Sequence, residues 1–446
     1  MSQEKSIFTE LRIQSTDGER LADLSQGVVA FEYYEDIFSP IITGKLRIIN
    51  SDNSIQIEGR EGKESLYNGL PLRGGERLTL VIASNSISNP GLDFSRVEKY
   101  FYVSAVTDVV TEGSQESFTL HLVPREAITN ETARVSGKFP SSLSISDAVK
   151  NIIKDHLTIT ESNTKINTGI IDKTSNKYGF MGNMRKPFTV LTWLASKAVP
   201  ESREVKGGSA GFVFYQTVNG FQFRSLDELA KQKPIAEYIH YDVVDTYDKN
   251  LRKSDGSNNI IRFFIEKNSN LIEKLRLGSY SNESMYFNPL TLSFNQKIYK
   301  SADYQKKVEN LGSRFKLPPI NSDTGDTLGD VPTRKMTFVS DIGTYEKGVD
   351  REINADPTEF QNQALMRYNT LFTQTISMTV QSNTNLKAGD VIDCKFPRLS
   401  ESNSNEYDPE TSGLYIIKEL CHHFNTVNSY TSLKIVRDTF GPQVKK

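Results

Sequence analysis

Hydrophobic and polar residues alternate along the first 127 residues and again near the end of the chain. In the first part the alternating segments are rich in β-branched and aromatic residues, which is typical of half-buried strands, and they lie at residues 7–13, 28–34, 41–49, 78–82, 100–106 and 118–123. Glu112-Gly113-Ser114 predicts a hairpin between the last two segments. Six or seven short antiparallel strands without a helix predict a barrel or sandwich, and closing the sheet would remove its exposed edges.

One pattern of spacing occurs twice in the chain. Both occurrences contain a leucine–glycine–acid turn, a tyrosine and a closing leucine: Leu72, Gly75, Glu76, Tyr102 and Leu120 in the first, and Leu386, Gly389, Asp390, Tyr415 and Leu433 in the second. The step from glycine to tyrosine is 27 residues in the first copy and 26 in the second, and the step from tyrosine to leucine is 18 in both. We therefore predict one small β-barrel built twice, with residues 51–71 as an extra loop of the first copy.

Helical spacing replaces the alternation after residue 124. Apolar residues recur at helical intervals from residue 145 to 157, and Ser144 with Asp147 predicts the capped start of this helix. Pro187 suits the first turn of a second helix, which Pro200 ends. Aromatic segments at residues 212–215 and 221–223 flank Val218-Asn219-Gly220, a strong hairpin signal.

The predicted fold is mainly β with α+β insertions. Its expected parts are a first barrel at residues 1–127, an α+β module of two helices and a hairpin at 128–255, a second barrel at 256–270 and 355–442, and an insertion of unassigned fold at 271–354. The second barrel should contain strands at 260–265 and 375–380, with a helix at 357–368 before the latter. Within the insertion we expect a helix around residues 304–315, a polar loop at 318–332 and a strand at 335–339.

Composition argues against nucleic-acid-binding and membrane-spanning functions. A chain of 446 residues exceeds one compact core, so two to four domains are expected, and a net charge of −2 gives no general basic field for nucleic acid or an anionic membrane. No apolar run approaches the ~18–20 residues of a membrane span, so no membrane insertion is expected. The polar N-terminus and a content of two cysteines, Cys394 and Cys421, favour synthesis in a reducing cytoplasm. Both thiols are expected to pack within strands, and whether they pair stays open.

The histidines give no metal-site pattern. His422 and His423 are neighbours on a strand, so their side chains should point to opposite faces, and their spacing from the cysteines follows no recognised zinc pattern. His156 is expected to be half-buried on the apolar stripe of its helix, and His121 to face solvent or a neighbouring subunit. The fifth histidine is His240.

Two other patterns fail as sites. Gly62-Lys63 departs from the phosphate-loop motif because the next residue is Glu64 rather than serine or threonine. Asp323, Asp326 and Asp330 do not have calcium-loop spacing. No hydrolase nucleophile motif, zinc-protease motif or isolated carboxylate pair stands out. We therefore expect no catalytic residue, no cofactor and no metal, and predict that the chain is not an enzyme.

The order of three stretches resembles the central baseplate hub of contractile-tailed, T4-like bacteriophages. This family is related to phage D-type tail proteins and to the N-terminal part of type VI secretion spikes. The likeness lies in the turn and strands of residues 386–436, in the helix at 188–199 with the aromatic hairpin at 211–223, and in the layout of residues 41–123. Residues 271–349 match nothing in the family. Because the sequence stops soon after the second barrel, a phage-type hub with a separate spike polypeptide is favoured.

The resemblance implies a homotrimer in the tail baseplate of a virion, assembled in the host bacterial cytoplasm. Three chains with two barrels each would form a pseudo-hexameric ring that adapts the sixfold tail tube to the threefold central spike, with transient, non-specific passage of DNA. Implied partners are the spike, the tail tube or tube-initiator protein, the tape-measure protein and the baseplate wedges. Alternatives are a spike or hub component of another contractile injection system, a tail-associated cell-wall or glycan-binding or -degrading protein, and an unrelated two-barrel protein.

Overall fold

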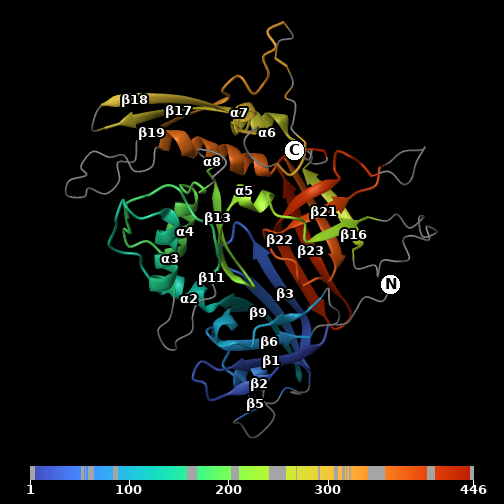
Figure 1. The fold of residues 1–446 in the computed structure, drawn as a ribbon. Coiled ribbons are helices and arrows are strands. Elements are labelled where there is room, and N and C mark those ends of the chain that lie inside the picture. Colours follow the sequence, from blue (N-terminus) through green and yellow to red (C-terminus); the bar gives the residue numbers. More distant parts are fainter. Residues whose placement is uncertain are drawn as a thin grey trace.

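The computed structural model describes residues 6–51, 55, 57–58, 65–83, 89–157, 168–201, 210–240, 258–267, 269–289, 292–305, 310–313, 317, 319–320, 323–339, 357–398 and 407–441. Strands form 47% of the structure and helices 18%, which confirms the predicted mainly β class. Figure 1 shows two twisted sheet regions side by side, the N-terminal one in blue and the C-terminal one in red, with the green α+β module beside them. A yellow and orange layer covers the module and the C-terminal region.

The described residues of the N-terminal region form nine strands and two short helical turns. They are β1 (Phe8–Gln14), β2 (Leu21–Asp23), β3 (Val28–Asp36), β4 (Thr43–Ser51), β5 (Ile57–Glu58), α1 (Leu66–Gly69), β6 (Arg77–Ile82), β7 (Leu92–Asp93), η1 (Val97–Lys99), β8 (Phe101–Glu112) and β9 (Gln115–Pro124). Glu112 pairs with Gln115, so the predicted hairpin at Gly113-Ser114 is confirmed.

The C-terminal region repeats the strand order of the first. Its strands are β15 (Ala236–Ile239), β16 (Ile260–Lys267), β20 (Gln374–Gln381), β21 (Val391–Lys395), β22 (Gly413–Asn425) and β23 (Ser429–Arg437). Neighbours follow the order β3-β4-β9-β8-β6-β1 in the first copy and β16-β20-β23-β22-β21-β15 in the second. One difference is that β15 runs parallel to β21, whereas β1 runs antiparallel to β6. The predicted duplication is therefore present in the topology.

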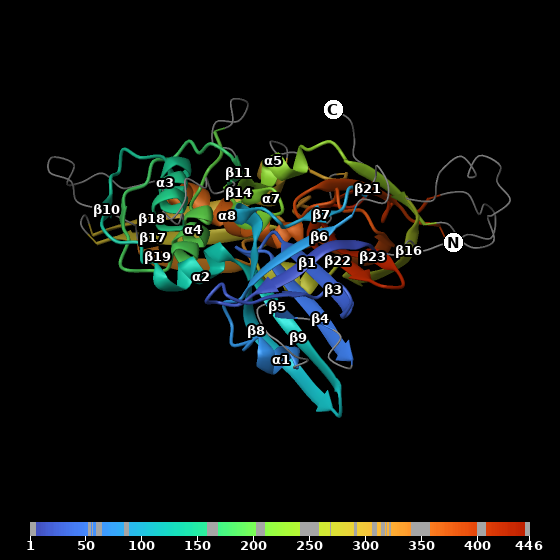
Figure 2. The ribbon, with the colours of Figure 1, turned by 90° about the horizontal axis from the view of Figure 1, so that it is seen from below.

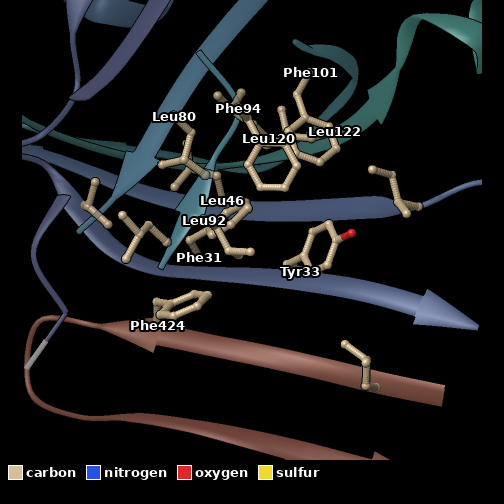
Figure 3. Close-up of a cluster of buried hydrophobic side chains, with 14 of the residues drawn as sticks. Phe31, Tyr33, Leu46, Leu80, Leu92, Phe94, Phe101, Leu120, Leu122 and Phe424 are labelled. Carbon is tan, nitrogen blue, oxygen red and sulfur yellow. The ribbon is translucent and has the colours of Figure 1, made fainter. Parts of the chain in front are cut away.

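The two copies form one sheet rather than two separate barrels. β22 pairs with β3, so the pairing path runs without a break from β16 through both copies to β5. No pairing between described strands closes either copy into a barrel. Each copy still folds over an apolar core. Figure 3 shows this core in the first copy, where Phe31, Leu46 and Leu120 gather with Leu80 and Phe94.

The glycine turns adopt the same structure in both copies. Gly75 and Gly389 have φ of 93° and 90°, which glycine adopts without strain. The backbone N–H of Gly75 donates to the carbonyl of Val103 (2.7 Å), and that of Gly389 donates to the carbonyl of Ile417 (2.8 Å). The acid after each glycine accepts a hydrogen bond from the N–H three residues before it.

These bonds correct the tyrosine equivalence by one residue. Since Val103 corresponds to Ile417, Tyr415 corresponds to Phe101, and Tyr102 to Ile416. Tyr415 is fully buried, whereas Tyr102 is only partly buried. The closing leucines do correspond, because Leu120 pairs with Val106 and Leu433 with Leu420, three residues after Val103 and Ile417 respectively. The tyrosine spacing was thus a near coincidence, and the glycine turn carries the repeat.

The module between the copies contains the elements α2 (Arg125–Thr132), β10 (Lys138–Phe139), α3 (Ile145–Ile152), η2 (Ile153–Leu157), β11 (Thr168–Ile171), β12 (Phe180–Met181), α4 (Pro187–Ala195), β13 (Phe212–Thr217), β14 (Gly220–Ser225) and α5 (Leu226–Ala230). Ser144 caps α3 by accepting from the Asp147 N–H, and Pro187 opens α4, as predicted. α4 ends at Ala195, five residues before Pro200. β13 and β14 form the predicted hairpin around Val218-Asn219.

The second insertion lies between β16 and β20, where the first copy has a short loop between β3 and β4. It contains α6 (Leu271–Arg276), β17 (Ser281–Asn288), β18 (Ser293–Lys300), α7 (Ser301–Gln305), β19 (Arg334–Val339) and α8 (Pro357–Leu371). The strand and helix predicted at 335–339 and 357–368 are confirmed, whereas β17 and β18 were not predicted. The helix predicted at 304–315 is wrong at residues 310–313, where the N–H groups of Leu311 and Gly312 donate to Asp438 and Thr439 instead of to a helix. Residues 304 and 305 do lie in α7, and residues 306–309 and 314–316 lie outside the described residues.

A buried arginine connects the insertion to both other parts. Arg367 of α8 is 2% exposed, and its guanidinium lies 3.1 Å from the Asp227 carboxylate of α5 and 2.6 Å from the Asp438 carboxylate after β23. Two carboxylates pair with this one buried cation, so burying the two negative charges costs more free energy when the arginine is removed.

Replacing Arg367 with alanine is expected to lower the free energy of unfolding by about 3–5 kcal/mol, because two buried carboxylates lose their partner. Denaturant unfolding followed by circular dichroism measures this. The matched control is Lys231→Ala, which removes the exposed Lys231–Glu228 pair and should change stability by less than about 1 kcal/mol. Equal effects of the two substitutions would contradict a connecting role for Arg367.

Candidate assembly site at the junction of the two sheet copies

One strand, β22, pairs with two different strands along one edge at the junction. Its residues 413–416 pair with β21 of its own copy, and its residues 419–425 pair antiparallel with residues 30–36 of β3. A bulge at Lys418 separates the two halves. Bulges bend a strand and increase its twist, which explains how β22 leaves one partner for the other. The equivalent bulge in β8 lies at Ser104.

Ion pairs line one face of the junction. The Lys418 ammonium lies 2.8 Å from the Asp36 carboxylate, and the His423 ring lies 3.2 Å from the Glu32 carboxylate. The Ile37 N–H donates to the Lys418 carbonyl (2.9 Å), which continues the pairing past the end of β3. The junction therefore combines ladder hydrogen bonds with the Lys418–Asp36 ion pair and the His423–Glu32 contact across the two copies.

Aromatic contacts line the opposite face, toward the apolar core. Phe31 stacks on Phe424 with ring centroids 6.2 Å apart, and Tyr33 stacks on His422 at 6.0 Å. His422 is fully buried, and its Nδ1 lies 2.9 Å from the Thr431 hydroxyl. Burial lowers the pKa of His422 to about 4, so its imidazole is neutral near pH 7.

Glu35 joins three parts of the chain at the end of the junction. One of its carboxylate oxygens accepts from the Val218 N–H of the module hairpin (2.7 Å) and from the Tyr33 hydroxyl (2.6 Å). The other accepts from the Ala388 N–H in the glycine turn of the second copy (2.8 Å). Glu35 is 2% exposed, and burial raises its pKa to about 7. Burial also raises the pKa of nearby Asp390 to about 6.

The sheet face opposite the two cores is mainly polar across the junction, with Phe264, Tyr34, Cys421 and Tyr430 also on it. Pairing places the following side chains of strands β16 to β9 on this face: Arg262, Glu266, Ser377, Thr379, Ser432, Lys434, Glu419, His423, Glu32, Lys45, Arg47, Thr119 and His121. Cations and carboxylates alternate with hydroxyl groups, and Lys434 pairs with Glu266 at 2.9 Å. The face thus carries charges of both signs rather than one basic or acidic field.

The structure separates the histidines and cysteines singled out from the sequence. His422 and His423 point to opposite faces, as predicted, and Cys394 is buried in the core, whereas Cys421 lies partly buried on the polar face; both thiols are free. His121 contacts the Thr107 hydroxyl on the polar face (3.0 Å). His156 is half-buried in η2, and His240 contacts Phe263. Among the described residues, no three metal-ligating side chains come together.

The remaining loop candidates have separate positions. The Asp330 carboxylate accepts from the N–H and the hydroxyl of Thr327. These two hydrogen bonds, together with one from the Lys300 ammonium, lower the pKa of Asp330 to about 2. Asp323 and Asp326 lie exposed in the same loop. Gly62 and Lys63 lie outside the described residues. Within the described part, no helix is long and apolar enough to cross a membrane.

Sequence reasoning missed Glu35, the residue that connects most parts. Its position gave one usable signal: in the alternating segment 28–34, the next inward-facing position holds an acid. A charged residue at an inward-facing strand position indicates buried hydrogen bonding, although the sequence does not say to what.

No protein-family model matches the chain. The "Probable baseplate hub protein gp334" of Vibrio phage KVP40 is 22% identical over 301 residues, which cover 66% of each protein, so the match spans just under two thirds of that relative. The resemblance to phage baseplate hubs is confirmed.

One solved structure supports the fold. The prophage MuSo2 43 kDa tail protein from Shewanella oneidensis superposes with a TM-score of 0.50 at 10% identity, covering 97% of this chain and 99% of that one. A tail protein from Neisseria meningitidis gives a TM-score of 0.49 at 10% identity and covers 98% and 97%. At these identities the likeness concerns the fold and not a shared activity.

Replacing Glu35 with glutamine is expected to flatten the pH dependence of stability. Because the folded-state pKa of about 7 exceeds the ordinary glutamate pKa of 4.5, the folded protein holds a proton that the unfolded chain releases. The contribution of Glu35 is therefore fully present below about pH 4.5 and is lost as the pH rises toward 7.

Unfolding midpoints measured between pH 4.5 and 8 test this expectation. The wild-type midpoint should fall with rising pH in this window, and Glu35→Gln should show a smaller slope. Asp390 titrates in the same direction, so the slope should shrink without vanishing. Identical slopes for the two proteins would show that Glu35 is ionised throughout the window.

Proposed function

We propose that the chain is a structural baseplate hub of a contractile phage tail, which forms a trimeric ring between the sixfold tail tube and the threefold central spike. The observation that carries this proposal is the β22–β3 junction, where two copies of one fold join edge to edge in a single sheet. Such a junction repeated around an axis gives a ring with six similar positions from three chains.

The two insertions would give the six-position ring features that repeat only three times. The first copy has a short β3–β4 loop at residues 37–42, whereas the second copy carries α6 to α8 at the corresponding place. Every second position around the ring would then present the insertion. One side of the ring could thus match a hexameric tube through the shared sheet, while the insertions and modules offer three equal contacts to a trimeric spike.

The polar face of the sheet suits a channel through which DNA passes. Its charges are of both signs, and several are paired with each other, as Lys434 is with Glu266. Phosphate binding requires uncompensated cations, so a mixed face holds DNA weakly. We propose that this face lines the lumen and that DNA passes through it transiently and without sequence preference.

The buried charges of the chain support a structural rather than a catalytic role. Glu35 and Glu76 each accept hydrogen bonds from backbone N–H groups. Glu116 accepts from the Leu66 N–H and from the side-chain amide of Asn50. All three carboxylates are thus occupied in holding turns and loops. We propose that the chain is not an enzyme, and that its partners are its own copies, the spike and the tail tube or tube initiator, with the tape-measure protein and the wedges as further neighbours in the virion baseplate.

The purified chain is expected to give a particle of three chains by light scattering, alone or with its spike protein. Negative-stain averages viewed along the axis should show a ring of six lobes with threefold differences, because each chain contributes two similar sheet regions. A monomer under all conditions, including with the spike, would contradict the ring. Light scattering of a dilution series is the control, because it shows how the proportion of trimer depends on protein concentration.

A further inference from the structure

Among the open edges of the described sheet, two lie at the ends of one row of strands. β8 pairs with β6 only through Phe101 and Tyr102, and its second edge is open beyond Ser104. β16 pairs with β20 along one edge, and its other edge is open after the Ile260 carbonyl, which His240 contacts. These are the two ends of the row β16-β20-β23-β22-β3-β4-β9-β8. An open edge offers unpaired N–H and carbonyl groups to another strand.

The two open edges correspond to the two strands of the internal junction. β8 corresponds to β22, since both follow the glycine turn, bulge after Val103 or Ile417, and pair with the closing strand. β16 corresponds to β3, since both bulge near their start, at Val28/Ala30 and Ile260/Arg262, before Phe31 and Phe263. The chain therefore contains one joined pair of this kind and the two separated halves of a second pair.

We propose that β8 of one chain pairs antiparallel with β16 of a second copy, so that residues 107–112 lie opposite residues 262–267. The register follows from the internal junction, where His423 lies opposite Glu32 and Phe424 opposite Phe31. Carrying these pairs over places Val110 opposite Phe264 and Thr111 opposite Phe263. The proposal rests on the ring function above and names the residues that close the ring.

An extra residue in each open edge supports this register. Compared with the internal junction, β8 has one more residue between Thr107 and Val110, and β16 has one more between Phe264 and Lys267. Both extra residues fall in the same part of the seam. Because both strands carry the extra residue, β8 and β16 match residue for residue from Thr107 to Glu112. If β8 were paired with β3, or β16 with β22, the one extra residue would shift the register.

The side chains of the two edges are complementary. On the edges themselves, Val110 is 51% exposed and Phe264 is 67% exposed, so their contact would bury apolar surface that now faces solvent. Glu112 lies opposite Arg262 in this register, which sets opposite charges together. Asp108 lies opposite Glu266, a pair of like charge, but Glu266 is already held by Lys434.

The seam between chains differs in chemistry from the junction within a chain. The internal junction sets His423 against Glu32, whereas the seam sets valine against phenylalanine at the same position. A β8 edge placed on β3 would lose the charge pair and the residue match together. This difference makes each edge selective for its own partner.

Disulfide trapping tests the seam. In a Cys421→Ser background, Val110→Cys with Phe264→Cys places one thiol on each edge at directly opposite positions on the same sheet face. Oxidation by dissolved oxygen with a copper catalyst removes two protons and two electrons per bond. Covalent trimers are expected on non-reducing gels and should revert to monomers with reductant.

The matched control is Thr111→Cys with Phe264→Cys, which moves one thiol to the other face of the sheet because strand side chains alternate. It should give no covalent trimer. If the protein forms a three-chain particle but the control pair cross-links, or neither pair cross-links, the proposed seam is wrong. The trimeric ring is not contradicted by that result. Absence of any particle larger than a monomer in the unmodified protein overturns the ring itself, and the seam with it.

A second pair of variants measures assembly without cross-linking. Phe264→Asp places a charge at the proposed seam and should reduce the trimer at least tenfold at a fixed concentration. Phe294→Asp is the control, since Phe294 is equally exposed at 68% but lies on β18. Loss of the trimer with both variants, or with neither, contradicts the assignment of Phe264 to the seam.

Discussion

The arrangement of the whole chain depends on the bulge at Lys418. β21 has five residues and β22 has thirteen, so β21 pairs only with the first part of β22, and the bulge lies where that pairing ends. The bulge lets the strand leave its own copy and pair with β3, and the hydrogen bonds of Glu35 then fix this pairing to the module hairpin and the second glycine turn. Figure 2 shows the result from below, with β22 and β3 side by side and the β8–β9 hairpin extending beyond the body.

Local patterns predicted the local structure well. Alternation found the strands of both copies, Ser144 and Pro187 marked the helix starts, and Asn219-Gly220 marked a hairpin, because each of these signals acts within a few residues. The predicted duplication holds for the same reason: a glycine at positive φ is demanded by the turn itself. The tyrosine equivalence failed because aromatic residues occur at several neighbouring strand positions, so their spacing does not define register.

Long-range contacts explain what the sequence did not predict. The helix expected at 304–315 gives way where Leu311 and Gly312 donate to Asp438 and Thr439, residues more than a hundred positions away. β17 and β18 are rich in polar residues, and they hold together through pairing with each other and through contact with α8, neither of which leaves a periodic trace. Arg367 looks like an ordinary surface charge in sequence, and the position of Glu35 indicates only that it faces inward; their burial between separate parts of the chain reveals what they hold together.

The module between β9 and β15 ties the two sheet copies into one polypeptide. Because of this tether, β22 meets β3 at a high effective concentration, so every second joint around a ring would form before any encounter between molecules. A closed ring of six similar positions would then need three intermolecular steps rather than six. The entropic cost of ordering free subunits falls accordingly, and control over when the ring closes rests with the joints between molecules alone.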